Sequence, residues 1–174
     1  DLPASAFARL PGTQGVSISP DGSRIAFVTH EGEERYVVVM DLETGAQEAA
    51  DFSTMRAYST FWTDEDTLIA TAGRTRELGI VSGDVNFQAF VTINADTMEA
   101  EQLIREGRDL GYNFDTASLA GEDPETGRLF MPLRDTRGAL NLYSVDPENG
   151  RRMSLVARGD ETTRGWISSP DGRS

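Results

Sequence analysis

The chain has 174 residues, and its 29 acidic residues outnumber its 16 basic ones, so the formal net charge is −13. Every basic residue is an Arg, and the chain contains one His and no Cys. These counts exclude a disulfide framework, a thiolate nucleophile and a cysteine zinc site, and the acidity argues against nucleic acid as a partner. No cofactor or metal is expected, and no apolar run approaches the ~20 residues of a membrane-spanning helix.

Short β-type runs recur along the chain, each bounded by turn-forming residues. The first two surround a Ser-Pro-Asp-Gly turn at 19–22, where Pro20 fixes φ and Gly22 permits a left-handed backbone. The only helical pattern is short, at 4–10. Such alternation of strands and turns is typical of an all-β fold. The expected strands lie within 17–29, 36–42, 67–72, 87–93, 128–133 and 140–145.

Two sequence markers repeat along the chain. The stretch at 15–22 (GVSISPDG) returns at 165–172 (GWISSPDG), and an Asp or Asn marker begins at Asp41, Asn94 and Asp146. A period of about 50 residues with four strands in each repeat indicates the blades of a β-propeller. We therefore predict a partial β-propeller of about three four-stranded blades plus the first strand of a fourth. Residues 1–14 lead into it, residues 15–174 form it, and the blades span about 15–52, 57–105 and 112–157, with the next starting at 165.

An unfinished ring has consequences for assembly and origin. Propellers have at least ~4 blades, so we expect a piece of a longer protein. Asp1 looks like a mature terminus after signal removal, which suggests a periplasmic or secreted bacterial protein. Open blade ends expose apolar side chains and unpaired strands, so we expect the isolated chain either to self-associate through them or to be marginally stable. The residues expected to be exposed there are Val38, Met40, Trp166 and Ile167.

The opening of the chain resembles a known family. Residues 2–11 (LPASAFARLP), followed by 16–27 (VSISPDGSRIAF), look like the start of bacterial prolyl oligopeptidase-family serine peptidases. That family joins an N-terminal β-propeller to a C-terminal α/β-hydrolase domain, and includes dipeptidyl and acylaminoacyl peptidases. The resemblance implies the propeller portion of such a peptidase, acting as scaffold and substrate-access filter for a hydrolase domain outside this chain. The turn at 19–22 also marks TolB-like periplasmic propellers, so the alternative is a non-enzymatic module that binds protein partners.

No catalytic residue is predicted within the chain. The family's nucleophile sits in a Gly-x-Ser-x-Gly elbow, and the stretch at 15–19 lacks the second Gly. His30 is interpreted as a solvated loop residue, and Glu33 and Glu34 as a polar turn. We therefore expect the chain alone to cleave nothing, whereas the parent protein would be a serine peptidase acting on peptides.

The candidate site lies on one face of the predicted propeller. Strand directions alternate within a blade, so loops between second and third strands share a face with the links between blades. In the resembled family this face would meet the hydrolase domain. The stretch 73–86 is predicted as a long loop on this face, and Trp62 and Trp166 as packing between blades. The predicted substrate-face residues, suited to pairing with a domain or a peptide carboxylate, are Arg74, Arg76, Arg134 and Arg137.

Overall fold

The computed structural model describes residues 12–31, 34–50, 55–77, 84–105 and 110–169. In these residues the regular secondary structure is entirely β-strand, which confirms the predicted all-β class. The described part contains no helix that could cross a bilayer. The short helix predicted at 4–10 lies outside the described residues.

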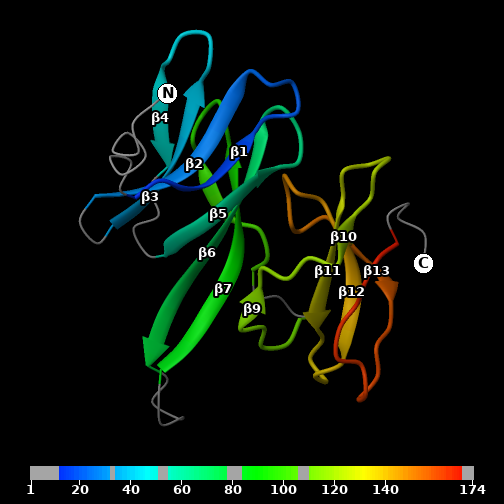
Figure 1. Cartoon of the computed structure of the whole chain (residues 1–174). Helices are drawn as coiled ribbons and strands as arrows, with labels where there is room; N and C mark the ends of the chain where they lie inside the picture. Colours follow the sequence, from blue (N-terminus) through cyan, green and yellow to red (C-terminus); the bar gives the residue numbers. More distant parts are fainter. Residues whose placement is uncertain (1–11, 32–33, 51–54, 78–83, 106–109, 170–174) are drawn as a thin grey trace, which may run out of the picture.

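The first sheet has four antiparallel strands in sequential order, the arrangement of a propeller blade. The predicted turn at 19–22 joins its first two strands. There Gly22, at φ 75°, donates its N–H to the Ser19 carbonyl at 2.9 Å, and the Ser19 hydroxyl donates to Asp21 at 2.6 Å. The strands are β1 (Gln14–Ile18), β2 (Arg24–Glu31), β3 (Glu34–Asp41) and β4 (Gln47–Ala50) (Figure 1).

The second sheet is built around a long hairpin. β6 (Thr67–Glu77) and β7 (Asp84–Asn94) pair along their whole length. β5 (Arg56–Trp62) reaches only as far as Gly73 of β6, and β8 (Ala100–Gln102) pairs with the other end of β7. The far part of the hairpin is therefore a two-stranded ribbon.

This ribbon corrects the loop predicted at 73–86, because most of that stretch is strand. The prediction rested on the glycines and arginines of this stretch and on its length, which exceeds that of a tight hairpin turn. In the structure Gly73 is needed within the strand, because a Cβ there would press on the Tyr58 ring and on the Phe87 carbonyl. The polar residues beyond it suit a ribbon that leaves the core, where no alternation with apolar residues is required.

The third sheet repeats the sequential antiparallel order. Between the second and third sheets, β9 (Asp115–Thr116) pairs in parallel with β7, so the chain returns to the second sheet before the third begins. Beyond the third sheet, residues 165–169 form no ladder within the described part, although the Ser168 N–H donates to the Ala120 carbonyl at 3.1 Å. The strands of the third sheet are β10 (Gly121–Glu122), β11 (Leu129–Arg134), β12 (Leu140–Val145) and β13 (Met153–Ala157).

Two apolar cores separate the three sheets. Alternate residues of β6 serve both: Leu68 belongs to the core against the first sheet, and Ile69 to the core against the third. In the second core Phe61 and Phe90 meet edge to face with centroids 5.5 Å apart, a favoured aromatic geometry. The middle sheet is thus buried on both faces, as an inner blade of a propeller must be.

The outer faces of this stack are unevenly exposed. Among the four residues expected at the open ends, Ile167 is 94% exposed, Met40 and Trp166 are half-buried, and Val38 is buried. The first sheet instead exposes Val16 and Ile18 of β1, at 63% and 60%. They alternate with the half-buried Ser17, whose hydroxyl contacts the second sheet, so they point away from that sheet.

Candidate functional site

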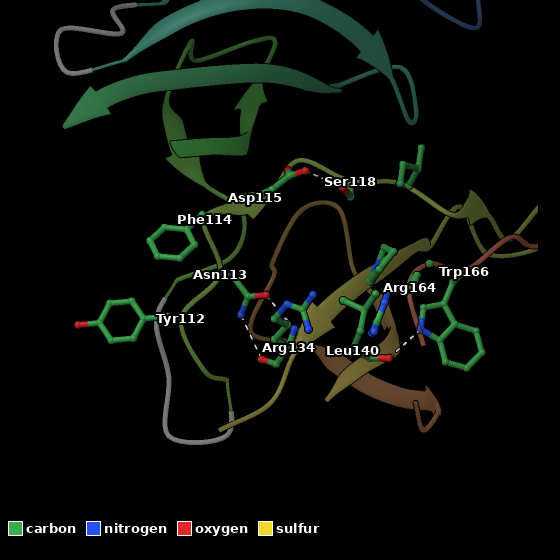
Figure 2. Close-up of a pocket in the computed structure, with 12 residues that line it drawn as sticks. Tyr112, Asn113, Phe114, Asp115, Ser118, Arg134, Leu140, Arg164 and Trp166 are labelled. Carbon is green, nitrogen blue, oxygen red and sulfur yellow. Dashed lines mark hydrogen bonds between the residues drawn. The ribbon is translucent and has the colours of Figure 1, made fainter. Parts of the chain in front are cut away.

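A pocket of about 490 Å³ lies at the end of the third sheet where β11 finishes and β12 begins. Three parts of the chain form it: the connection that precedes the third sheet, the ends of β11 and β12, and the segment that follows β13. Figure 2 shows the aromatic rings of the connection on one side, the Trp166 ring on the other, and the arginines between them. The lining residues used below are Tyr112, Phe114, Asp115, Arg134, Arg164 and Trp166.

One wall is fixed by Asn113. Its side-chain carbonyl accepts the Arg134 N–H at 2.8 Å, and its amide donates to the Arg134 carbonyl at 3.1 Å. Asn suits this position because its amide supplies both a donor and an acceptor. The Gly111 N–H adds a bond to the same carbonyl at 2.9 Å. The connection is thereby attached to the last residue of β11 by three hydrogen bonds.

The opposite wall is held by a tight turn. The Asp160 carboxylate accepts the N–H and hydroxyl groups of Thr162 and Thr163, at distances from 2.7 to 3.0 Å. These bonds, led by that from the Thr162 hydroxyl, lower the pKa of Asp160 to about 2. Beyond the turn, the Trp166 indole N–H donates to the Leu140 carbonyl at 2.9 Å. The indole ring is therefore fixed against β12.

An aromatic ledge, formed by Phe87, Tyr112 and Phe114, borders the pocket. Tyr112 and Phe114 stack at 6.4 Å with an interplanar angle of 26°, and Phe114 meets Phe87 of β7 at 5.4 Å. Tyr112 is 78% exposed and Phe114 46%. Arg74 lies over the Phe87 ring, with its guanidinium carbon 5.9 Å from the ring centroid. The ledge thus continues from the pocket to the base of the β6–β7 ribbon.

The pocket's charges are unevenly neutralised. Arg134 and Arg164 each donate from one terminal nitrogen to a backbone carbonyl, of Gly138 and Glu161 respectively, both at 2.8 Å. Neither forms an ion pair with a carboxylate among the described residues, whereas Arg24, Arg105, Arg128, Arg137 and Arg152 do. The nearby Asp115 carboxylate accepts from the Ala117 N–H and the Ser118 hydroxyl within its own turn. The site therefore presents two guanidinium groups to its opening.

The four predicted substrate-face arginines are not gathered into one group. Arg134 lines the pocket, and Arg74 lies on the aromatic ledge. Arg137 is in the turn beyond β11, where it approaches Asp135 at 3.7 Å. Arg76 belongs to β6, and its side chain lies outside the described part. The described residues contain no group of three or more His, Cys, Asp or Glu able to hold a metal ion.

Sequence reasoning missed the residues that shape the pocket. Tyr112, Asn113 and Phe114 alternate aromatic, polar, aromatic, and the prediction placed them only at the start of the third blade. The same alternation marks an extended segment with both rings on one side, so it was the available signal. Trp166, interpreted as packing between blades, forms a pocket wall instead. Its role depends on the path of the chain after β13, for which the sequence carries no local signal.

The arrangement of the sheets can be compared with known proteins. No protein-family model matches the chain, and no curated protein matches it. Among solved structures, a protein described as TolB from Agrobacterium tumefaciens aligns with 94% of this chain and 57% of its own, with a TM-score of 0.52 and 14% identity. The acylaminoacyl peptidase of Pyrococcus horikoshii aligns with 84% of this chain and 25% of its own, with a TM-score of 0.54 and 17% identity. The fold is that of a partial β-propeller.

The partial propeller spans only part of each of these neighbours, 57% of the TolB chain and 25% of the peptidase chain. At these identities the likeness concerns the fold alone. In fold, the predicted resemblance to the propellers of prolyl oligopeptidase-family peptidases is confirmed, because an acylaminoacyl peptidase is among the neighbours. The three sheets do not close into a ring over the described residues, in agreement with a partial propeller.

Proposed function

We propose that this chain is the non-catalytic propeller portion of a prolyl oligopeptidase-like serine peptidase, located in the bacterial periplasm or secreted. It serves as a scaffold for a hydrolase domain outside the chain and limits which peptides reach the active site. The family resemblance of residues 2–27 and the partial propeller fold support this proposal.

The observation that carries the proposal is the position of the pocket. It lies where β11 ends and β12 begins, and its walls are the connections that enter and leave the third sheet. In a propeller, the hairpins between second and third strands and the links between blades share one face. β6 and β11 run toward the same end in Figure 1, so the ribbon and the pocket belong to that face. A domain joined through the propeller's ends would cover it.

A TolB-like module that binds protein partners is the second candidate. The exposed aromatic ledge favours it, because Tyr and Arg side chains are enriched at the centres of protein interfaces. This function requires no hydrolase domain, and the same face would bind a folded partner or a peptide.

Labelling with a serine-directed fluorophosphonate separates the two candidates. The 174-residue chain and the longest natural protein that contains it are treated side by side, and hydrolysis of aminoacyl and peptidyl chromogenic substrates is measured for both. We expect stoichiometric labelling and turnover from the longer protein alone. A longer protein that is neither labelled nor active favours the TolB-like module. Labelling of any Ser within the 174 residues contradicts both candidates.

A further inference from the structure

We infer that the pocket bounded by Arg134, Arg164 and Trp166 binds the C-terminal carboxylate of a peptide whose last residue is aromatic or large and apolar. This inference goes beyond the proposed function, because it concerns a binding step that needs no hydrolase domain. It follows from the charge, the shape and the apolar surface of the site.

Charge complementarity identifies the anionic group. A guanidinium has five N–H donors, and one terminal nitrogen of each arginine is held by a backbone carbonyl, which fixes the group and leaves other donors for a ligand. Planar guanidinium groups bind carboxylates through paired hydrogen bonds. Although the chain has a net charge of −13, these two arginines line one pocket without a carboxylate partner in the described structure, so the pocket has a local excess of positive charge.

The carboxylate of Asp115, which lines the pocket, does not neutralise the two arginines. Asp115 turns both oxygens toward donors of its own turn, the Ala117 N–H at 2.8 Å and the Ser118 hydroxyl at 2.7 Å. It lines the pocket without pairing with Arg134 or Arg164. A carboxylate supplied by a ligand therefore meets donors that the described part of the chain leaves unpaired with acid.

The apolar surfaces specify what accompanies the carboxylate. The Trp166 indole N–H donates to the Leu140 carbonyl, so the rest of the ring forms an apolar wall of the pocket. The Tyr112 and Phe114 rings stack on the side of the connection that faces away from Arg134, so the Trp166 ring is the apolar surface next to the arginines (Figure 2). A volume of about 490 Å³ is within the range of small-ligand sites and suits a few residues of an extended peptide. A C-terminal aromatic or large apolar residue places a ring or branched chain beside its own carboxylate, which matches both features.

The test uses the 174-residue chain at a concentration where sedimentation shows a single species. Three blocked peptides are titrated by calorimetry: acetyl-Ala-Ala-Phe as the free acid, the same peptide as the C-terminal amide, and acetyl-Ala-Asp-Ala amide, which offers only a side-chain carboxylate. We expect the free acid to bind at least about tenfold more tightly than the other two, because loss of a charge-assisted bond has this size. Equal binding of acid and amide, or stronger binding of the Asp peptide, overturns the inference.

The location of binding is followed through the two indole N–H signals in a nitrogen–proton spectrum. The chain has two Trp residues, and Trp166→Phe assigns their signals. The free-acid peptide should shift the Trp166 signal. The Trp62 signal should not change, because Trp62 packs in the core between the first two sheets. A shift confined to Trp62, or no binding at millimolar peptide, also overturns the inference.

Matched variants separate recognition from folding. Arg134→Gln and Arg164→Gln should each weaken the free-acid peptide about tenfold while the amide is unaffected. Arg151→Gln removes the same charge from the exposed turn between β12 and β13, and should change nothing. Replacing the Phe of the free-acid peptide with Ala should weaken binding, because the Trp166 ring then loses its apolar partner. An equal loss in the Arg151 variant would mean that net charge alone attracts the peptide.

Discussion

The hydroxyl groups of Thr60 and Ser17 lie 2.8 Å apart and join the first strands of two adjacent sheets. Thr60 also donates to the Gly15 carbonyl at 2.9 Å, so one buried side chain connects β5 with two residues of β1. The contact is polar and directional, and it lies beside the apolar core between the two sheets. It therefore fixes how the first sheet is placed against the second, as well as contributing to stability.

Thr60→Val keeps the shape of the side chain but removes this connection. The Gly15 carbonyl and Ser17 hydroxyl then lose a partner at a partly buried site, so we expect a loss of about 1–3 kcal/mol in the free energy of unfolding. Urea denaturation measures it. Thr75→Val is the control, because the Thr75 hydroxyl bonds Asn86 in the exposed ribbon. Equal losses from both variants would mean that the connection between the sheets has no special weight.

Trp166→Phe tests whether residues 165–169 are held on the third sheet by the indole. Removing the N–H leaves the Leu140 carbonyl without this donor, which should cost about 0.5–1.5 kcal/mol. The near-ultraviolet circular dichroism of the aromatic rings should change as well. Its neighbour Ile167 is almost fully exposed, so Ile167→Ala should leave stability unchanged. A stable Trp166→Phe chain with an unaltered spectrum would contradict the anchoring role.

Asp160 gives the fold a defined acid sensitivity. Its pKa is lowered from 3.8 to about 2, first by the Thr162 hydroxyl and then by the Thr162 N–H and Thr163 hydroxyl. Because the folded-state pKa lies below the unfolded one, the ionised carboxylate stabilises the fold fully above about pH 4, and this contribution is lost as the pH falls through 2. Urea midpoints should therefore fall more steeply over this window in the natural chain than in Asp160→Asn.

Glu161→Gln is the control for this pH dependence. It removes a negative charge next to Asp160 but leaves the hydrogen bonds of the turn intact. Its acid profile should follow the natural chain. Parallel profiles for the natural chain and Asp160→Asn would show that the turn's bonds do not distinguish the folded from the unfolded state.

The ribbon arginines offer a test of the predicted substrate face. If that face borders the route of the substrate, replacing Arg74 and Arg76 with Ala in the longer protein should change the ratio of kcat/KM between acidic and neutral peptides by about 1–3 kcal/mol. Folding should be unaffected, since these residues lie beyond the four-stranded part of the second sheet. Arg151→Ala is the matched control. Unchanged kcat/KM ratios across several peptides would mean that these arginines do not contact the substrate.

The exposed stripe formed by Val16 and Ile18 predicts how the isolated chain behaves. An apolar stripe on the outer face of the first sheet favours association between copies, so sedimentation at micromolar concentration should show species larger than a monomer. Val16→Thr with Ile18→Thr keeps the β-propensity and should shift the population toward monomer. A monomeric natural chain that melts cooperatively above ~65 °C would contradict this prediction, because it would mean that the three sheets are self-sufficient.

Local sequence chemistry predicted much of the fold. The turn at 19–22 was predictable because Pro and Gly act on their own backbone. The repeated Asp or Asn marker also has a local cause. The side chains of Asp41 and Asn94 each accept hydrogen bonds from the backbone N–H groups two and three positions later in the chain. The marker tolerates substitution at its end, where Met98 adopts φ 55° in the place of Gly45 at 72°.

The remaining features depend on contacts far apart in sequence. β9 has only two residues, and its parallel pairing with β7 comes from tertiary structure, so no periodicity marks it. The pocket depends on Asn113 bonding the end of β11 and on Trp166 bonding the start of β12. The sequence shows the residue types of the pocket. It does not show that they lie together, because this depends on the paths of the connections before and after the third sheet.

The β6–β7 ribbon has a consequence for how the length of this hairpin can vary. Beyond the pairing of Gly73 with Gln88, each strand of the ribbon bonds mainly to the other, outside the four-stranded part of the sheet. Adding or removing one residue in each of its two strands would move the residues beyond that point to the opposite face of the ribbon, and a second such change would restore them. The length and charge of the ribbon can therefore change, two residues per strand at a time, while the sheets keep their register.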